Sequence, residues 1–87
     1  MKEGKNIDLH PDEDGEPFKA EKFAFRVTAD RTVAGMDESA KRDWIAQETQ
    51  AVDESLAYAR KQYSETNPEV IKLRAQRRVL YELATGL

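Results

Sequence analysis

Apolar side chains recur at alternating steps of three and four residues through the second half of the chain. This spacing places them on one face of a helix, so it predicts two amphipathic helices, over about residues 37–65 and 68–85. The stripe of the first helix is Ile45, Thr49, Val52, Leu56, Ala59 and Tyr63. That of the second comprises Leu73, Ala75, Val79, Leu80, Leu83 and Ala84.

The residues at the ends of these stripes favour the same boundaries. Asp37 is suited to open the first helix, with Ser39 as an alternative cap. Proline disfavours the helical conformation in the residue before it, so Asn67 should cap a second helix that starts at Pro68. Gly86 suits a left-handed residue just past the end. Because the connection is short, we expect an antiparallel hairpin.

A different period precedes the hairpin. Between Lys22 and Thr28 the side chains alternate, with Phe23, Phe25 and Val27 on one side, which predicts a β-strand over residues 22–28. Residues 6–10 alternate briefly and suggest a second short strand. The expected fold is therefore mostly α: an antiparallel two-helix hairpin preceded by one or two short β-strands. We expect residues 1–21 to form a polar acidic arm and residues 22–87 a single small domain.

Composition narrows the class of protein. The chain has 87 residues, of which 39% are hydrophobic and 36% charged, so its core is thin. One side of each helix in a hairpin needs a cover, which could be the N-terminal segment, a second copy or another protein. The absence of cysteine excludes disulfides and a cysteine zinc site. No apolar run is long enough to span a bilayer and no signal-peptide core is visible, so we expect no membrane contact and a cytoplasmic protein, or one associated with a virion.

Charge is distributed unevenly along the chain. Residues 1–40 carry a net charge of −4, whereas residues 70–87 carry +3. Arg74, Arg77 and Arg78 share one helix face, and with Lys72 they are the best candidates for partner recognition. The simplest interpretation is a solvated face. As a binding face it could meet carboxylates of a protein or phosphates of a nucleic acid, and we rank the protein first because the rest of the chain is acidic.

Aromatic residues at helical spacing usually pack in the core, and we interpret Trp44, Tyr58 and Tyr63 in that way. Four aromatic residues are also candidates for contact with a protein partner or a second copy, because a thin core leaves some of them uncovered. These are Phe23, Phe25, Trp44 and Tyr58.

The acidic segment before the strand partly matches the calcium loop of EF-hand proteins. Asp12, Asp14, Gly15 and Glu21 stand at the third, fifth, sixth and twelfth places of that pattern. His10 replaces the first aspartate, and no amphipathic helix precedes the loop, so a solvated acidic turn is the preferred interpretation. We expect no cofactor and no catalytic residue, because no nucleophile motif accompanies the single histidine.

The predicted order of strand, helix and helix resembles the topology of ribbon-helix-helix repressors. In that arrangement Ala24, Arg26 and Thr28 would face the bases of DNA. The first helix is longer than in those proteins, and the turn lacks their glycine. We therefore expect a small non-enzymatic interaction protein, an accessory or structural subunit or an inhibitor, within a larger assembly of the kind found in phage and plasmid systems. A dimeric nucleic-acid-binding regulator is the alternative, and a calcium-binding module a weaker one.

Overall fold

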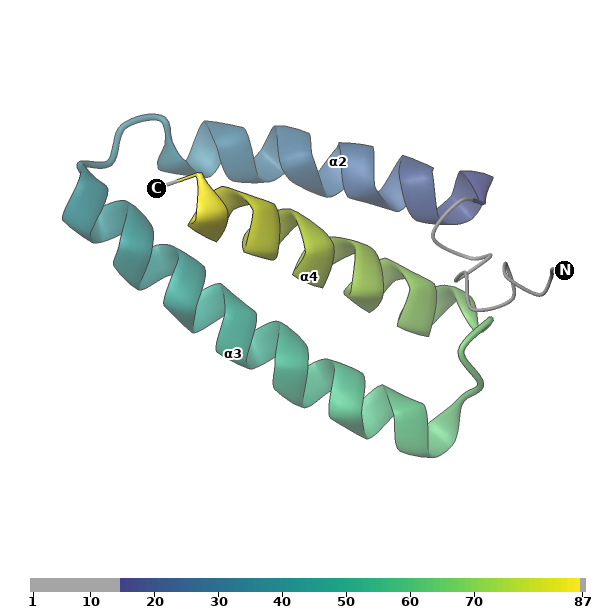
Figure 1. The fold of residues 1–87 in the computed structure, drawn as a ribbon. Helices are drawn as coiled ribbons and strands as arrows, with labels where there is room; N and C mark the ends of the chain where they lie inside the picture. Colours follow the sequence, from purple (N-terminus) through teal and green to yellow (C-terminus); the bar gives the residue numbers. More distant parts are fainter. Residues whose placement is uncertain (1–14, 87) are drawn as a thin grey trace, which may run out of the picture.

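The structure is a computed structural model that describes residues 15–86, and these residues form three α-helices (Figure 1). Helix α2 spans Glu16–Val33, α3 spans Glu38–Gln62 and α4 spans Pro68–Thr85. Helix α4 lies between the other two and packs against both. It runs in the same direction as α2 and opposite to α3. The mostly helical fold and the pairing of α3 with α4 are confirmed.

The predicted strand over residues 22–28 is wrong, because this segment is the middle of α2. The helix begins directly after Gly15 and has Pro17 in its first turn, a position that proline favours. A helix satisfies its backbone groups internally, whereas a lone strand leaves them unpaired. Helix α2 runs through residues 21 and 22, where the expected boundary between arm and domain falls. The second expected strand, over residues 6–10, lies outside the described residues.

The ends of the hairpin helices follow the cap residues. The Asp37 side chain accepts a hydrogen bond from the Ala40 amide at 2.8 Å, and Asn67 accepts one from the Glu69 amide at 2.9 Å. Helix α3 ends earlier than expected, because Tyr63 is extended with φ −132°. The expected left-handed residue at Gly86 is wrong: its φ is −83°, and its amide donates to the carbonyls of Glu82 and Leu83.

The core follows the two flanks of α4. On one flank Val70, Leu73 and Leu80 pack with Val52, Leu56 and Ala59 of α3, and the half-buried Phe25 and Trp44 lie against this cluster. On the other flank Ile71 and Ala75 pack with Phe18 of α2. Of the three covers considered from sequence, the N-terminal segment supplies one, in the form of α2. Among the described residues no polar or charged side chain is buried.

Candidate functional site

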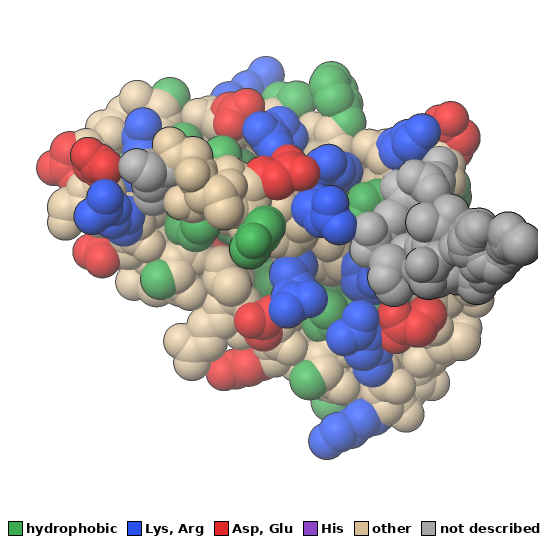
Figure 2. All heavy atoms as spheres, in the orientation of Figure 1, with side chains coloured by type: hydrophobic (Ala, Val, Ile, Leu, Met, Phe, Trp, Pro, Cys, Tyr) green, Lys and Arg blue, Asp and Glu red, His purple; other side chains and the backbone are tan. Residues whose placement is uncertain are grey.

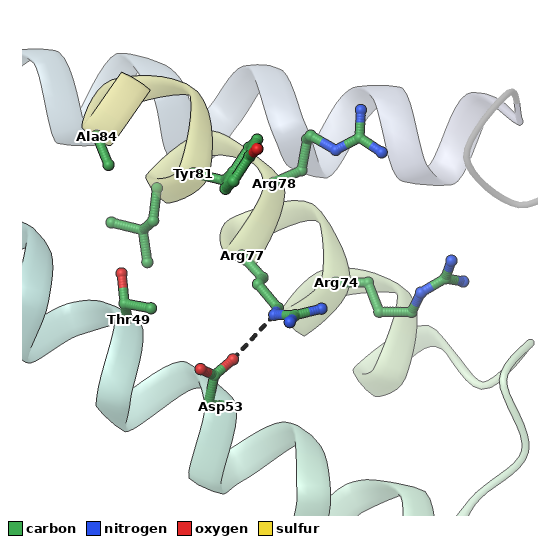
Figure 3. A pocket seen from close by; sticks show the side chains of 8 residues that line it. Thr49, Asp53, Arg74, Arg77, Arg78, Tyr81 and Ala84 are labelled. Carbon is green, nitrogen blue, oxygen red and sulfur yellow. Dashed lines mark ion pairs between the residues drawn. The ribbon is translucent and has the colours of Figure 1, made fainter. Parts of the chain in front are cut away.

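Three arginines and a tyrosine project from one side of α4, and we call Arg74, Arg77, Arg78 and Tyr81 the arginine ridge (Figure 3). Steps of three and four residues place them together on the side of α4 that turns away from the packed flanks. Together with Thr49 and Asp53 of α3 they line a groove with a volume of about 680 Å³. The Tyr81 side chain is 67% exposed. Figure 2 shows Lys and Arg side chains gathered over the middle of this face, with carboxylates among them.

An ion pair crosses the groove. Arg77 Nε lies 2.9 Å from Asp53 Oδ1, and both side chains are about half exposed (Figure 3). An exposed pair of this kind adds only about 0–1 kcal/mol to stability, because water solvates and screens both charges. An anion from another molecule could therefore replace Asp53 as the partner of Arg77 at small cost.

Arg74 has a different environment from the other two arginines. Its side chain is only 10% exposed, and its Nε lies 3.7 Å from Glu65 Oε1 in the turn between α3 and α4. Burial, and then the charge of Arg78, lower the pKa of Arg74, although a guanidinium stays protonated at neutral pH. Arg74 is thus the arginine of the ridge that lies nearest the turn, whereas the side chains of Arg77 and Arg78 are exposed.

Lys72, predicted together with the arginines, lies outside the ridge. It lies two residues from Arg74, so helical periodicity turns it about 160° away from that side chain. Its Nζ is 3.8 Å from Glu69 Oε1 on the same helix. The structure therefore brings three of the four predicted basic residues together and separates the fourth.

Glu82 of α4 forms ion pairs with two side chains of α2. Lys22 Nζ lies 3.0 Å from Glu82 Oε2, and Arg26 pairs with the other carboxylate oxygen. Burial raises the pKa of Glu82, but the hydrogen bond from Lys22 and the charges of Lys22, Arg26 and Arg78 outweigh it, so the net pKa is lowered. Arg26, which the ribbon-helix-helix arrangement would turn toward the bases of DNA, instead contacts Glu82 of α4.

The four predicted aromatic contact residues separate into two groups. Phe25 and Trp44 are half-buried against the core. Phe23 and Tyr58 are 72% and 66% exposed. The interpretation of Tyr58 and Tyr63 as core residues is wrong, because Tyr63 is also 49% exposed. Tyr58 lies two residues after Leu56 and so turns off the buried stripe, whereas Tyr63 follows the end of the helix.

The calcium-loop interpretation rests on Asp12, Asp14 and Glu21. The two aspartates lie outside the described residues, and Glu21 is in the second turn of α2. The second half of the calcium-loop pattern, from Glu16 to Glu21, is helical in this structure. It therefore cannot wrap around a cation as an EF-hand loop does. Between residues 15 and 86 no three His, Cys, Asp or Glu side chains gather as a metal-binding group.

Sequence analysis missed five residues that line the groove. Asp53 and Tyr81 were assigned to no site, and Thr49, Leu80 and Ala84 were assigned only to the apolar stripes. The spacing contained a signal for Tyr81, which follows Arg77 and Arg78 by four and three residues. Asp53 could not be found in this way, because its contact with Arg77 depends on how α3 and α4 align.

Comparison of the chain with protein-family models, curated proteins and solved structures finds no match. None of the helices in the described part of the chain is long and apolar enough to cross a bilayer. The functional argument therefore rests on the surfaces of the three helices themselves.

Proposed function

We propose that this chain is a small non-enzymatic protein that binds an acidic segment of a partner protein in the groove between α3 and α4. The observation that carries this proposal is the pair of exposed arginines, Arg77 and Arg78, beside the exposed Tyr81 on the wall of an open groove. Exposed arginine and tyrosine together are typical of residues that dominate protein interfaces. Guanidinium groups also fork onto carboxylates with two parallel hydrogen bonds.

The other wall of the groove suggests what else the partner segment carries. A second, more open hollow of about 720 Å³ continues along α3 and shares Thr49, Asp53 and Ala84 with the first. Its lining includes Ile45 and Ala46, so apolar surface adjoins the arginine ridge. A segment with acidic residues on one side and apolar residues on the other fits both surfaces.

Nucleic acid is the second candidate, and two observations place it lower. The strand that would have read bases is a helix, so the topological resemblance to ribbon-helix-helix repressors is lost. The arginine ridge also has carboxylates close by, Asp53 on Arg77 and Glu82 near Arg78, in a chain of net charge −3. Phosphate neutralisation supplies most non-specific affinity for nucleic acid, and these carboxylates oppose it.

Fluorescence anisotropy with a labelled peptide of alternating glutamate and leucine tests the proposal. We expect binding that weakens as salt rises, because the contact is between charges at the surface. The double variant Arg77→Gln/Arg78→Gln should bind about 10-fold more weakly. Asp53→Asn should bind about 3-fold more tightly, because Arg77 then loses its internal carboxylate partner.

The control variant Arg31→Gln/Lys61→Gln removes the same charge from two exposed residues that do not line the groove. It should bind the peptide as the wild type does. If both double variants lost the same affinity for the peptide, net charge alone would explain the effect. That result would overturn the assignment of the groove as the binding site. Salt-dependent binding to random duplex DNA that is lost in Arg77→Gln/Arg78→Gln would instead make the nucleic-acid regulator the better conclusion.

A further inference from the structure

A second groove lies between α3 and α4, close to the turn that joins them, and we call it the tyrosine groove. Its volume is about 520 Å³. It shares no residue with the groove beside the arginine ridge. The residues that line it are Glu54, Ser55, Tyr58, Ala59, Tyr63, Glu69 and Leu73. Glu54 also lines the hollow along α3 that the proposed function uses, whereas the other six residues do not.

The end of α3 produces this groove. Tyr63 leaves the helix in an extended conformation, while its amide still donates to the Ala59 carbonyl at 2.8 Å. Tyr63 therefore does not continue the buried stripe, and it lines the groove instead. Tyr58 precedes it by five residues and lines the same groove from the helix itself. The two rings are 66% and 49% exposed, and the buried Ala59 and Leu73 lie among them.

The charged groups of the tyrosine groove are both acidic. Glu54 and Glu69 line it, and no lysine or arginine does. Glu54 accepts a hydrogen bond at 3.3 Å from the neutral amide of Gln50. The closest described cation to Glu69 is Lys72, at 3.8 Å, which is beyond hydrogen-bond distance. Neither carboxylate is therefore committed to a strong internal partner in the described part of the chain.

Two aromatic rings, an apolar floor and two carboxylates together favour one chemical class of ligand. A cation near the face of an aromatic ring gains about 0.5–2 kcal/mol, and the gain is larger when water is excluded. An arginine side chain combines such a cation with an apolar stem that can lie along Ala59 and Leu73. We propose that the tyrosine groove binds an arginine side chain presented by a basic segment of a partner protein.

The two grooves then have opposite preferences. The arginine ridge offers cations to an acidic segment, and the tyrosine groove offers carboxylates and aromatic rings to a basic one. They flank the α3–α4 contact on different sides, because Asp53 and Tyr58 lie on opposite sides of the buried stripe that contains Val52 and Leu56. The chain thus offers separate grooves to segments of opposite charge.

The test uses a short labelled peptide of alternating glycine and arginine, with the same peptide in citrulline form as the neutral control. In a nuclear magnetic resonance titration at physiological salt, we expect saturable shifts at Tyr58, Tyr63 and Glu69 with the arginine peptide only. Tyr58→Ala and Glu69→Gln should each weaken binding about 5-fold. Both substituted side chains are exposed, so far-ultraviolet circular dichroism should show an unchanged fold.

Tyr81→Ala is the matched control, because Tyr81 is as exposed as Tyr58 but lies on the arginine ridge. It should bind the arginine peptide normally, as should Arg77→Gln/Arg78→Gln. Equal shifts with the citrulline peptide, or shifts confined to the carboxylates of residues 1–14, would overturn the proposal. Self-association that both Tyr58→Ala and Arg77→Gln/Arg78→Gln abolish would replace the partner by a second copy, whose ridge would then occupy the groove. None of these outcomes depends on the acidic peptide, so the two proposals fail separately.

Discussion

One carboxylate of α4, that of Glu82, forms ion pairs with two basic side chains of α2. Lys22 and Arg26 stand one helical turn apart on α2, so both reach the same side chain. The Glu82 side chain is one-third exposed, and each contact alone would add little to stability. Two cations on one carboxylate nevertheless fix the rotation of α2, because a turn of the helix would remove both contacts together.

Glu82 should make stability depend on pH in the acidic range. Its pKa in the folded chain is lowered, so its contribution is complete above the ordinary glutamate pKa of about 4.3 and is lost as pH falls through the lower folded value. We expect Glu82→Gln to reduce the free energy of unfolding by about 1 kcal/mol at neutral pH. Urea unfolding of both proteins between neutral pH and about pH 3 should show this difference shrinking toward zero.

Glu38→Gln is the control for that experiment, because Glu38 pairs with Arg42 within the exposed surface of α3 alone. It should change stability by only about 0.3–0.5 kcal/mol at neutral pH. A Glu82 effect that stays constant down to the acid limit would contradict the assigned role of the two cations.

Contacts between single residues were the part of the site least accessible to sequence reasoning. The shared face of Arg74, Arg77 and Arg78 follows from helical spacing and was predicted. The near-burial of Arg74 and the pairing of Arg77 with Asp53 depend on how neighbouring elements align, which spacing within one helix does not encode. The sequence thus identified these arginines as a group. Only the structure shows that Arg74 is nearly buried and that Arg77 pairs with Asp53.

Helix α2 illustrates how one sequence can carry two patterns. Phe23, Phe25 and Val27 alternate as in a strand, and this period led to the wrong prediction. The helical pattern uses a different subset, because Phe18, Phe25 and Ala29 recur at steps of seven and four and face the core. Only packing against α4 decides between the two, since short apolar runs fit either period.

Two phenylalanines of α2 provide a matched test of this assignment. Phe18 is 3% exposed and Phe23 is 72% exposed. Phe18→Ala should reduce the free energy of unfolding by about 3–5 kcal/mol, as expected for a buried aromatic side chain. Phe23→Ala should change it by no more than about 0.5 kcal/mol. Urea denaturation of both variants measures the two effects. A larger loss of unfolding free energy in Phe23→Ala than in Phe18→Ala would favour the predicted strand, in which Phe23 is buried.

The helical hairpin was predicted with better success because its signals agreed with one another. The apolar stripes, the cap residues Asp37 and Asn67, and Pro68 all pointed to the same boundaries. In the N-terminal half, the pattern of Phe23 and Phe25 conflicted with the helix start at Pro17. Helices α3 and α4 could therefore be predicted from the sequence because several independent local signals agreed.

At the scale of the whole molecule, α4 is the element on which the others depend. Of the buried apolar residues between positions 15 and 86 it carries half, including Val70, Val79 and Leu80, which are fully enclosed. Helices α2 and α3 each pack mainly against α4. Removing α2 exposes one flank of α4, whereas removing α4 leaves both other helices without their principal neighbour.

Hydrogen exchange should therefore be slowest in α4. An amide exchanges when its helix opens, and opening α4 breaks the packing on both of its flanks, whereas opening α2 breaks only one. We expect the amides near Val79 and Leu80 to exchange only through global unfolding, and those near Phe23 to exchange sooner through a partial opening that releases α2. Native-state exchange followed by nuclear magnetic resonance at increasing urea distinguishes these routes, because global opening depends steeply on urea and partial opening weakly. Glu82→Gln should speed exchange in α2 and at the slowest amides of α4 by the same factor, because the release of α2 and global unfolding both break the contacts of Glu82 with Lys22 and Arg26. Equal protection in α2 and α4 would mean that the three helices open as one unit, and earlier exchange in α4 than in α2 would contradict its central position.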